Sequence, residues 1–146
     1  MNAVELLREH NRIVRARLQQ FDGVEFKHTG DGIAAWFLTA GAAVECGLLI
    51  LEDLERANAD RVEEALFIRI GLAAGEVVCD GADVFGLAVI TAFRICDHAR
   101  DGRILVSKEV PALARNADLT FVGFGDVVLK GFSDSVSLYA VEAVRR

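Results

Sequence analysis

The stretch VEFKHTGDG, residues 24–32, decides the fold. Apolar and charged side chains alternate over its first five residues, which is the period of a β-strand. Residues 29–32 are turn formers, and the apolar run 33–38 that follows predicts a second strand. The stretch therefore predicts a β-hairpin. Because Lys27 lies two residues from Glu25, the alternation predicts that both side chains share one face of the first strand.

Helical patterns lie on both sides of this hairpin. Residues 2–21 carry apolar side chains at three- and four-residue steps and are followed by Asp-Gly, a helix stop. Thr39 is a good N-cap for a helix that runs to about residue 59. Residues 87–99 predict a third helix, and residues 108–115 a short fourth helix with a proline in its first turn.

The remaining apolar runs predict strands. We expect a central strand at 66–73 that continues through a glycine bend over 75–79, followed by strands at 103–107, 119–122, 127–129 and 136–141. The predicted order is α-ββ-α-ββ-α-β-α-βββ. Hairpins mixed with crossover helices predict an α/β (α+β) sandwich, in which helices pack on a mixed sheet.

Composition limits the classes of protein to consider. A chain of 146 residues with 53% hydrophobic residues predicts one folded domain. The longest apolar run, residues 40–51, contains a glutamate and is too short to span a bilayer, and residues 1–21 are amphipathic, unlike a secretory leader. Three cysteines without metal-ligand spacing predict reduced thiols in a cytoplasmic protein. The net charge of −6 argues against broad binding to nucleic acid.

Several side chains are candidates for chemistry. Asp31, between two glycines at the hairpin tip, has the steric access that a hard cation such as Mg²⁺ or Mn²⁺ needs. Taken alone, a simple turn is favoured there by about two to one, because Gly and Asp dominate turns. Arg94 lies in an apolar helix and Arg69 in an apolar strand, and a charge in such surroundings is costly unless it is paired or faces a ligand. For Arg94 a structural ion pair is an equal alternative, and Arg69 either faces a polar cleft or snorkels at the end of its strand.

Two further candidates are weaker by themselves. Asp83 precedes the third predicted helix and could cap it. Lys130, at the end of a predicted strand, is in the ordinary position of an exposed lysine.

Together these positions resemble the class III adenylyl/guanylyl cyclase catalytic domain. The similar segments cover essentially the whole chain: residues 5–12 (ELLREHNR), 27–32 (KHTGDG), 68–77 (IRIGLAAGEV), 83–86 (DVFG) with Arg94, 103–107 (RILVS), and 129–131 (LKG) with Tyr139. The resemblance implies a ferredoxin-like cyclase sandwich formed by a single domain, residues 1–146, that dimerises with a nucleotide at the seam. The family begins with a strand where this chain begins with a predicted helix, so the resemblance also implies a domain truncated at its N-terminus.

The resemblance also implies roles for individual residues. Lys27 and Asp83 would read the purine, Asp31 would bind Mg²⁺ or Mn²⁺, and Arg94 would stabilise charge at the α-phosphate. Lys130 and Arg69 would hold the other phosphates. The reaction implied is attack of the ribose 3′-oxygen of ATP on the α-phosphorus, which gives cyclic AMP and pyrophosphate.

Two departures from the family pattern leave alternatives open. The family's second metal-binding aspartate lies on the initial strand, and Ile90 stands where the family usually has an asparagine. Loss of one transition-state donor costs on the order of 10²–10³ in rate. These departures favour reduced activity as a homodimer, with this chain serving as the base-reading partner of a complete cyclase domain. The alternatives are a catalytically silent module that binds a nucleotide or a regulatory partner, and a generic ferredoxin-like interaction domain.

Overall fold

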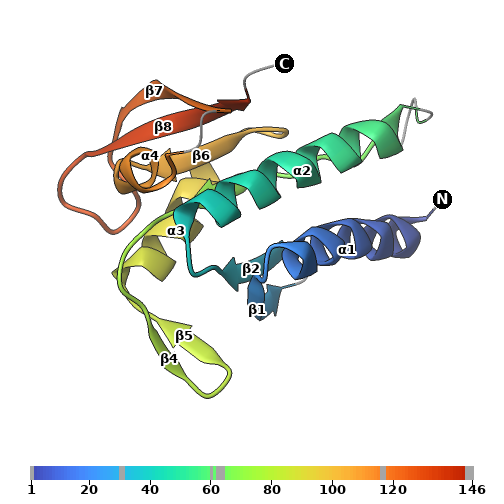
Figure 1. The fold of residues 1–146 in the computed structure, drawn as a ribbon, viewed down its shortest axis with the longest axis horizontal. Coiled ribbons are helices and arrows are strands. Elements are labelled where there is room, and N and C mark those ends of the chain that lie inside the picture. Colours follow the sequence, from blue (N-terminus) through green and yellow to red (C-terminus); the bar gives the residue numbers. More distant parts are fainter. Residues whose placement is uncertain (1, 30–31, 60, 62–64, 116–117, 144–146) are drawn as a thin grey trace.

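The computed structural model describes residues 2–29, 32–59, 61, 65–115 and 118–143. Helices and strands alternate along the chain (Figure 1). They are α1 (Ala3–Gln20), β1 (Val24–Thr29), β2 (Gly32–Trp36), α2 (Ala40–Asn58), β3 (Ile70–Leu72), β4 (Val78–Asp80), β5 (Asp83–Phe85), α3 (Leu87–His98), β6 (Ile104–Ser107), α4 (Glu109–Leu113), β7 (Leu119–Val127) and β8 (Val136–Ala143). The mixed α/β architecture predicted from the sequence is confirmed.

The strands of the described residues form three sheets. The largest has the order β3-β6-β8-β7, in which β3 and β6 are parallel and the other pairs are antiparallel. The β1–β2 hairpin and the β4–β5 hairpin are each a separate two-stranded sheet. In the described part of the chain, no helix is both long enough and apolar enough to cross a bilayer.

Helix α2 lies between the two halves of the molecule (Figure 1). One apolar stripe contacts a cluster that includes β6, and a second stripe contacts α1 and β2. The first stripe consists of Val44, Leu48 and Leu51, and the second of Cys46, Ile50 and Leu54. Two buried faces explain why residues 40–51 are almost entirely apolar.

Helix α3 packs unusually close to β3. A Cβ atom added at Gly71 would lie 2.4 Å from the backbone nitrogen of Cys96 and 2.7 Å from the carbonyl oxygen of Ala92. Only a residue without a side chain allows this approach. On the same helix, Ile95 is fully buried in a cluster with Leu105 and Leu138. The position of α3 on the sheet is therefore fixed by backbone contact as well as by core packing.

The helix predictions are confirmed to within about two residues at most ends. Asn2 and Glu5 form a capping box at the start of α1, and the Thr39 hydroxyl accepts a hydrogen bond from the Ala42 N–H at the start of α2. Helix α4 spans Glu109–Leu113 and is shorter than the predicted helix by one residue at its start and two at its end.

Two strand predictions are wrong. The strand expected over 66–79 is divided: β3 covers Ile70–Leu72, and Val78–Asp80 instead pairs with Asp83–Phe85 in the β4–β5 hairpin. The strands expected at 119–122 and 127–129 are the single strand β7, which continues through a register shift between Gly123 and Gly125. A β-bulge inserts a residue without ending the hydrogen-bonded ladder, so glycines there do not mark a loop.

Candidate functional site

A β-bulge in β1 sets the direction of Lys27. Glu25 pairs with Ala35 of β2, but Lys27 pairs with the adjacent residue Ala34, so Phe26 is the inserted residue. Neighbouring residues of a strand point to opposite faces. The prediction that Lys27 and Glu25 share a face is therefore wrong, because the bulge redirects Lys27 to the other side of the hairpin.

Glu25 lies on the hairpin face that meets α1. Its carboxylate accepts two hydrogen bonds from Arg15, at 2.8 Å from Nε and 3.1 Å from Nη2. These hydrogen bonds lower the pKa of Glu25, although partial burial opposes them. The bidentate pair holds α1 against the strand directly before the bulge.

Lys27 points toward α3. Its Nζ lies 5.8 Å from the centre of the Phe93 ring, which is within the range of a cation–π contact. Strand β1 also contacts β5, and β5 begins at the exposed residue Asp83. The structure thus brings the Lys27 strand, the Asp83 strand and the helix that carries Arg94 into contact.

Arg94 is accessible to a ligand. Its side chain is 36% exposed, and its Nη1 lies 3.9 Å from Oδ2 of Asp97, a side chain that is 64% exposed. An ion pair with so long a distance and so much exposure to water contributes little to the free energy of folding. The structural ion pair considered from the sequence is therefore weak.

Arg69 and Lys130 lie on segments that also pack against α3. The Arg69 carbonyl oxygen accepts a hydrogen bond from Sγ of Cys96 at 3.5 Å. Leu129, the residue before Lys130, shares a buried cluster with Ile95. Both cationic side chains are exposed. Helix α3 is thus the element that Lys27, Arg69, Arg94 and Lys130 have in common.

Asp31, the predicted metal ligand, lies outside the described residues. Within the described ranges, no three His, Cys, Asp or Glu side chains gather closely enough to form a metal site of their own.

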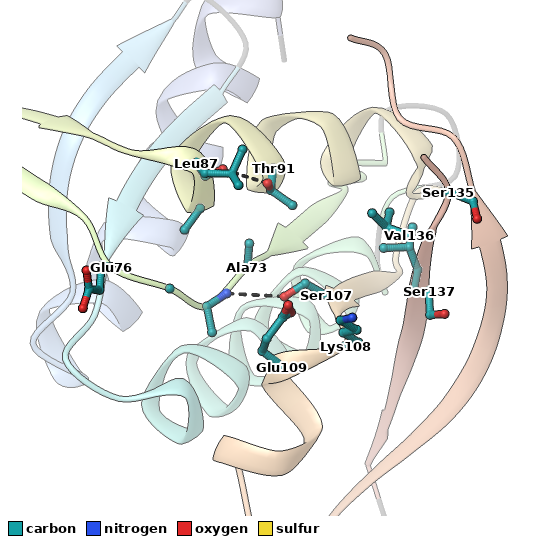
Figure 2. A pocket seen from close by; sticks show the side chains of 14 residues that line it. Ala73, Glu76, Leu87, Thr91, Ser107, Lys108, Glu109, Ser135, Val136 and Ser137 are labelled. Atoms are coloured by element: carbon teal, nitrogen blue, oxygen red, sulfur yellow. Dashed lines mark hydrogen bonds between the residues drawn. The ribbon is translucent and has the colours of Figure 1, made fainter. Parts of the chain in front are cut away.

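Sequence reasoning missed a hollow of about 500 Å³ beside the first turns of α3 (Figure 2). The hollow lies between the segment after β3, the end of β6 and the start of β8. None of the site residues that were predicted from the sequence and lie within the described ranges lines it. Ser107, in its wall, is 7% exposed and accepts a hydrogen bond from the Ala74 N–H at 3.4 Å. Ser107 and its neighbours Lys108 and Glu109 form an ordinary strand-to-helix junction in the sequence, so no signal marks them.

Apolar side chains are exposed on the β4–β5 hairpin and on the adjacent face of α3. They are Val78, Phe85, Leu87, Ile90 and Phe93, each at least 40% exposed. Large apolar side chains that gather on a surface commonly mark a protein interface. This apolar surface adjoins the contact between Lys27 and α3.

Comparison with known proteins gives consistent matches. Residues 1–143 match the family model described as the adenylate and guanylate cyclase catalytic domain. The chain is 31% identical over 119 residues to the Rhizobium meliloti (strain 1021) protein named "Putative adenylate cyclase 3", a match that covers 80% of this chain and 20% of that protein. It is 29% identical over 138 residues to the serine/threonine-protein kinase pkn2 of Myxococcus xanthus, which covers 92% of this chain and 16% of the kinase.

Solved structures match over nearly the full chain. The adenylate/guanylate cyclase/hydrolase from Silicibacter pomeroyi superposes with a TM-score of 0.84 at 27% identity, over 95% of this chain and 84% of that one. The adenylyl cyclase CyaB from P. aeruginosa superposes with a TM-score of 0.83 at 22% identity, over 100% of this chain and 86% of that one, which shows the fold. The chain spans about a fifth or less of the length of the curated relatives that it matches.

Proposed function

Because the chain belongs to the family of adenylate and guanylate cyclase catalytic domains, we propose that it takes part in forming cyclic AMP from ATP. The observation that carries this proposal is the contact of three elements at one place: β1 with Lys27, β5 with Asp83, and α3 with Arg94. These elements carry an ammonium, a carboxylate and a guanidinium, the groups that the proposal needs.

Lys27 and Asp83 would select the base. An ammonium donates hydrogen bonds and a carboxylate accepts them, so the pair complements a purine edge that carries both a ring nitrogen and an amino group. Adenine has that pattern. Both side chains are exposed, so neither must leave a buried partner before substrate binds.

Arg94 would act on the phosphate chain. The charge on the α-phosphate changes as the 3′-oxygen attacks, and a preplaced guanidinium lowers the barrier without having to reorganise. Lys130 and Arg69 would hold the remaining phosphates, which leave as pyrophosphate. The overall charge of −6 does not oppose this, because a single triphosphate needs only a few placed cations.

Catalytic domains of this family generally use divalent metal ions, and we propose Mg²⁺ or Mn²⁺ held by Asp31. Mg²⁺ is commonly bound by one or two carboxylates together with substrate phosphates. A single aspartate between two glycines fits that arrangement. When bound, the ion would neutralise part of the triphosphate charge.

We also propose that the reaction takes place between two cyclase domains. Domains of this family dimerise, and the apolar surface on β4–β5 and α3 lies next to the proposed nucleotide site. Ile90, which is 52% exposed on this surface, offers no polar group to a substrate. This favours a second candidate, in which the chain supplies base recognition to a complete partner domain and is slow as a homodimer.

The test is a cyclase assay with Mn²⁺ and either ATP or GTP. Activity should fall on the order of 10²-fold or more in Arg94→Ala, the loss typical of a transition-state donor, and Lys27→Met should weaken the preference for ATP. Lys108→Met and Arg100→Ala are matched controls outside the proposed site. Equal product formation by the wild type and Arg94→Ala would refute the catalytic role.

A mixing experiment separates the two candidates. The chain is combined with an intact homologous cyclase domain whose own Lys27 equivalent has been replaced. If this chain is a base-reading partner, product formation should rise well above that of either protein alone. If product formation does not rise and the homodimer is also inactive, both candidates are refuted and the chain is a catalytically silent module.

A further inference from the structure

An exposed aromatic ring contacts Lys27, one of the cations that the proposed function assigns to the nucleotide, and belongs to the residue directly before Arg94. The Phe93 ring lies 5.8 Å from Nζ of Lys27, and Phe93 directly precedes Arg94 on α3. The ring is 40% exposed, although an aromatic side chain of this size usually lies in a core or at an interface. Packing within the described domain therefore leaves part of the Phe93 ring uncovered.

The surroundings of the ring complement a nucleotide. The ammonium of Lys27 can donate to an acceptor on a base, and the ring offers a flat apolar surface. Ile90, one helical turn earlier, extends the apolar surface. An ammonium beside an aromatic face matches the acceptor edge and the ring of a nucleobase.

We propose that Phe93 stacks on the nucleobase and, before substrate binds, restricts Lys27 to the conformations from which it reads the base. This inference rests on the proposed function and adds to it a residue that contacts the substrate. A free lysine side chain samples many rotamers, and a cation–π contact reduces that freedom in advance. The base would then meet a donor that is already in position.

The competing explanation is that Phe93 is simply part of the apolar surface at a subunit seam. That role needs apolar volume but no aromatic ring, and it does not distinguish a base from a phosphate chain. The two explanations therefore predict different results for Phe93→Leu.

The experiment measures binding of two probes by titration calorimetry. The probes are 3′-deoxy-ATP, which lacks the attacking hydroxyl and cannot be cyclised, and inorganic tripolyphosphate, which lacks the base. Phe93→Leu should raise the Kd for 3′-deoxy-ATP about 10-fold or more, as loss of base stacking does, and leave the Kd for tripolyphosphate within about twofold. Phe93→Tyr keeps the ring and should retain wild-type affinity for both probes. Phe124→Leu, a change at another exposed phenylalanine, is the matched control.

The outcomes separate this inference from the function on which it rests. Wild-type affinity for 3′-deoxy-ATP in Phe93→Leu overturns the stacking role alone. Equal weakening of both probes also overturns it, because a seam or packing role would act on both. If the wild-type chain binds neither probe, the proposed function itself fails.

Discussion

The close approach of α3 to β3 at Gly71 leads to a quantitative prediction for Gly71→Ala. The new methyl group would lie 2.4 Å from the Cys96 nitrogen, whereas ordinary van der Waals contact begins at 3.4 Å. The helix must therefore retreat by about 1 Å. Overpacking of this kind costs about 1–3 kcal/mol of unfolding free energy, which for a domain of this size lowers Tm by roughly 3–9 °C. Because Phe93 and Arg94 lie on the helix that moves, the proposed cyclase activity should fall by more than the loss of folded protein explains.

The assay is urea unfolding followed by circular dichroism, with activity measured on the same samples. Gly123→Ala is the matched control, because a methyl group there would meet no atom within 4 Å, and its stability should stay within about 0.5 kcal/mol of the wild type. If Gly71→Ala is as stable as Gly123→Ala, the backbone contact does not hold α3 in place and the reasoning about its position is refuted.

Three further predictions test other parts of the structure. Ile95→Ala, at a fully buried position, should lower the unfolding free energy by about 2–5 kcal/mol in urea titrations, and a loss under 1 kcal/mol would contradict its place in the core. Hydrogen bonds from Arg17 lower the pKa of Asp53 below its ordinary 3.8, and those from Arg15 lower the pKa of Glu25 below 4.5. Each carboxylate therefore stabilises the fold above its ordinary pKa and loses that contribution as the pH falls through its lowered pKa. Asp53→Asn should flatten the decline in stability measured below pH 3.8. Burial raises the pKa of the Cys46 thiol to about 11. A thiol reagent at pH 8 should therefore modify the exposed Cys79 rapidly and Cys46 only after unfolding. Rapid reaction of Cys46 in the folded Cys79→Ser variant would show that Cys46 is not buried.

Local patterns in the sequence are sufficient to predict the helices and the first hairpin. The caps at Asn2 and Thr39 and the apolar repeat of residues 87–99 depend on interactions within one segment, so they can be read without tertiary knowledge. The strand errors arise where neighbouring strands decide the outcome. Whether the glycines of residues 123–125 end a strand or form a bulge depends on the pairing of β7 with β8.

The candidate site shows the same division. The residue types and order at Lys27, Asp83 and Arg94 carry the resemblance to a family, and the structure brings their three elements into contact. The direction of Lys27 depends on a bulge that strict alternation does not predict. The contact with Phe93 joins residues 66 positions apart in sequence, and no local pattern predicts such a contact.

Helix α2 has a mechanical consequence for the site. Its 19 residues extend about 28 Å, with the Lys27 hairpin packed against one stripe and the sheet that carries α3 against the other. The position of the Lys27 hairpin relative to α3 therefore depends on α2 as well as on the contact of Lys27 with Phe93. A proline placed midway would kink α2 and shift the hairpin relative to α3 while every side chain of the candidate site stays unchanged.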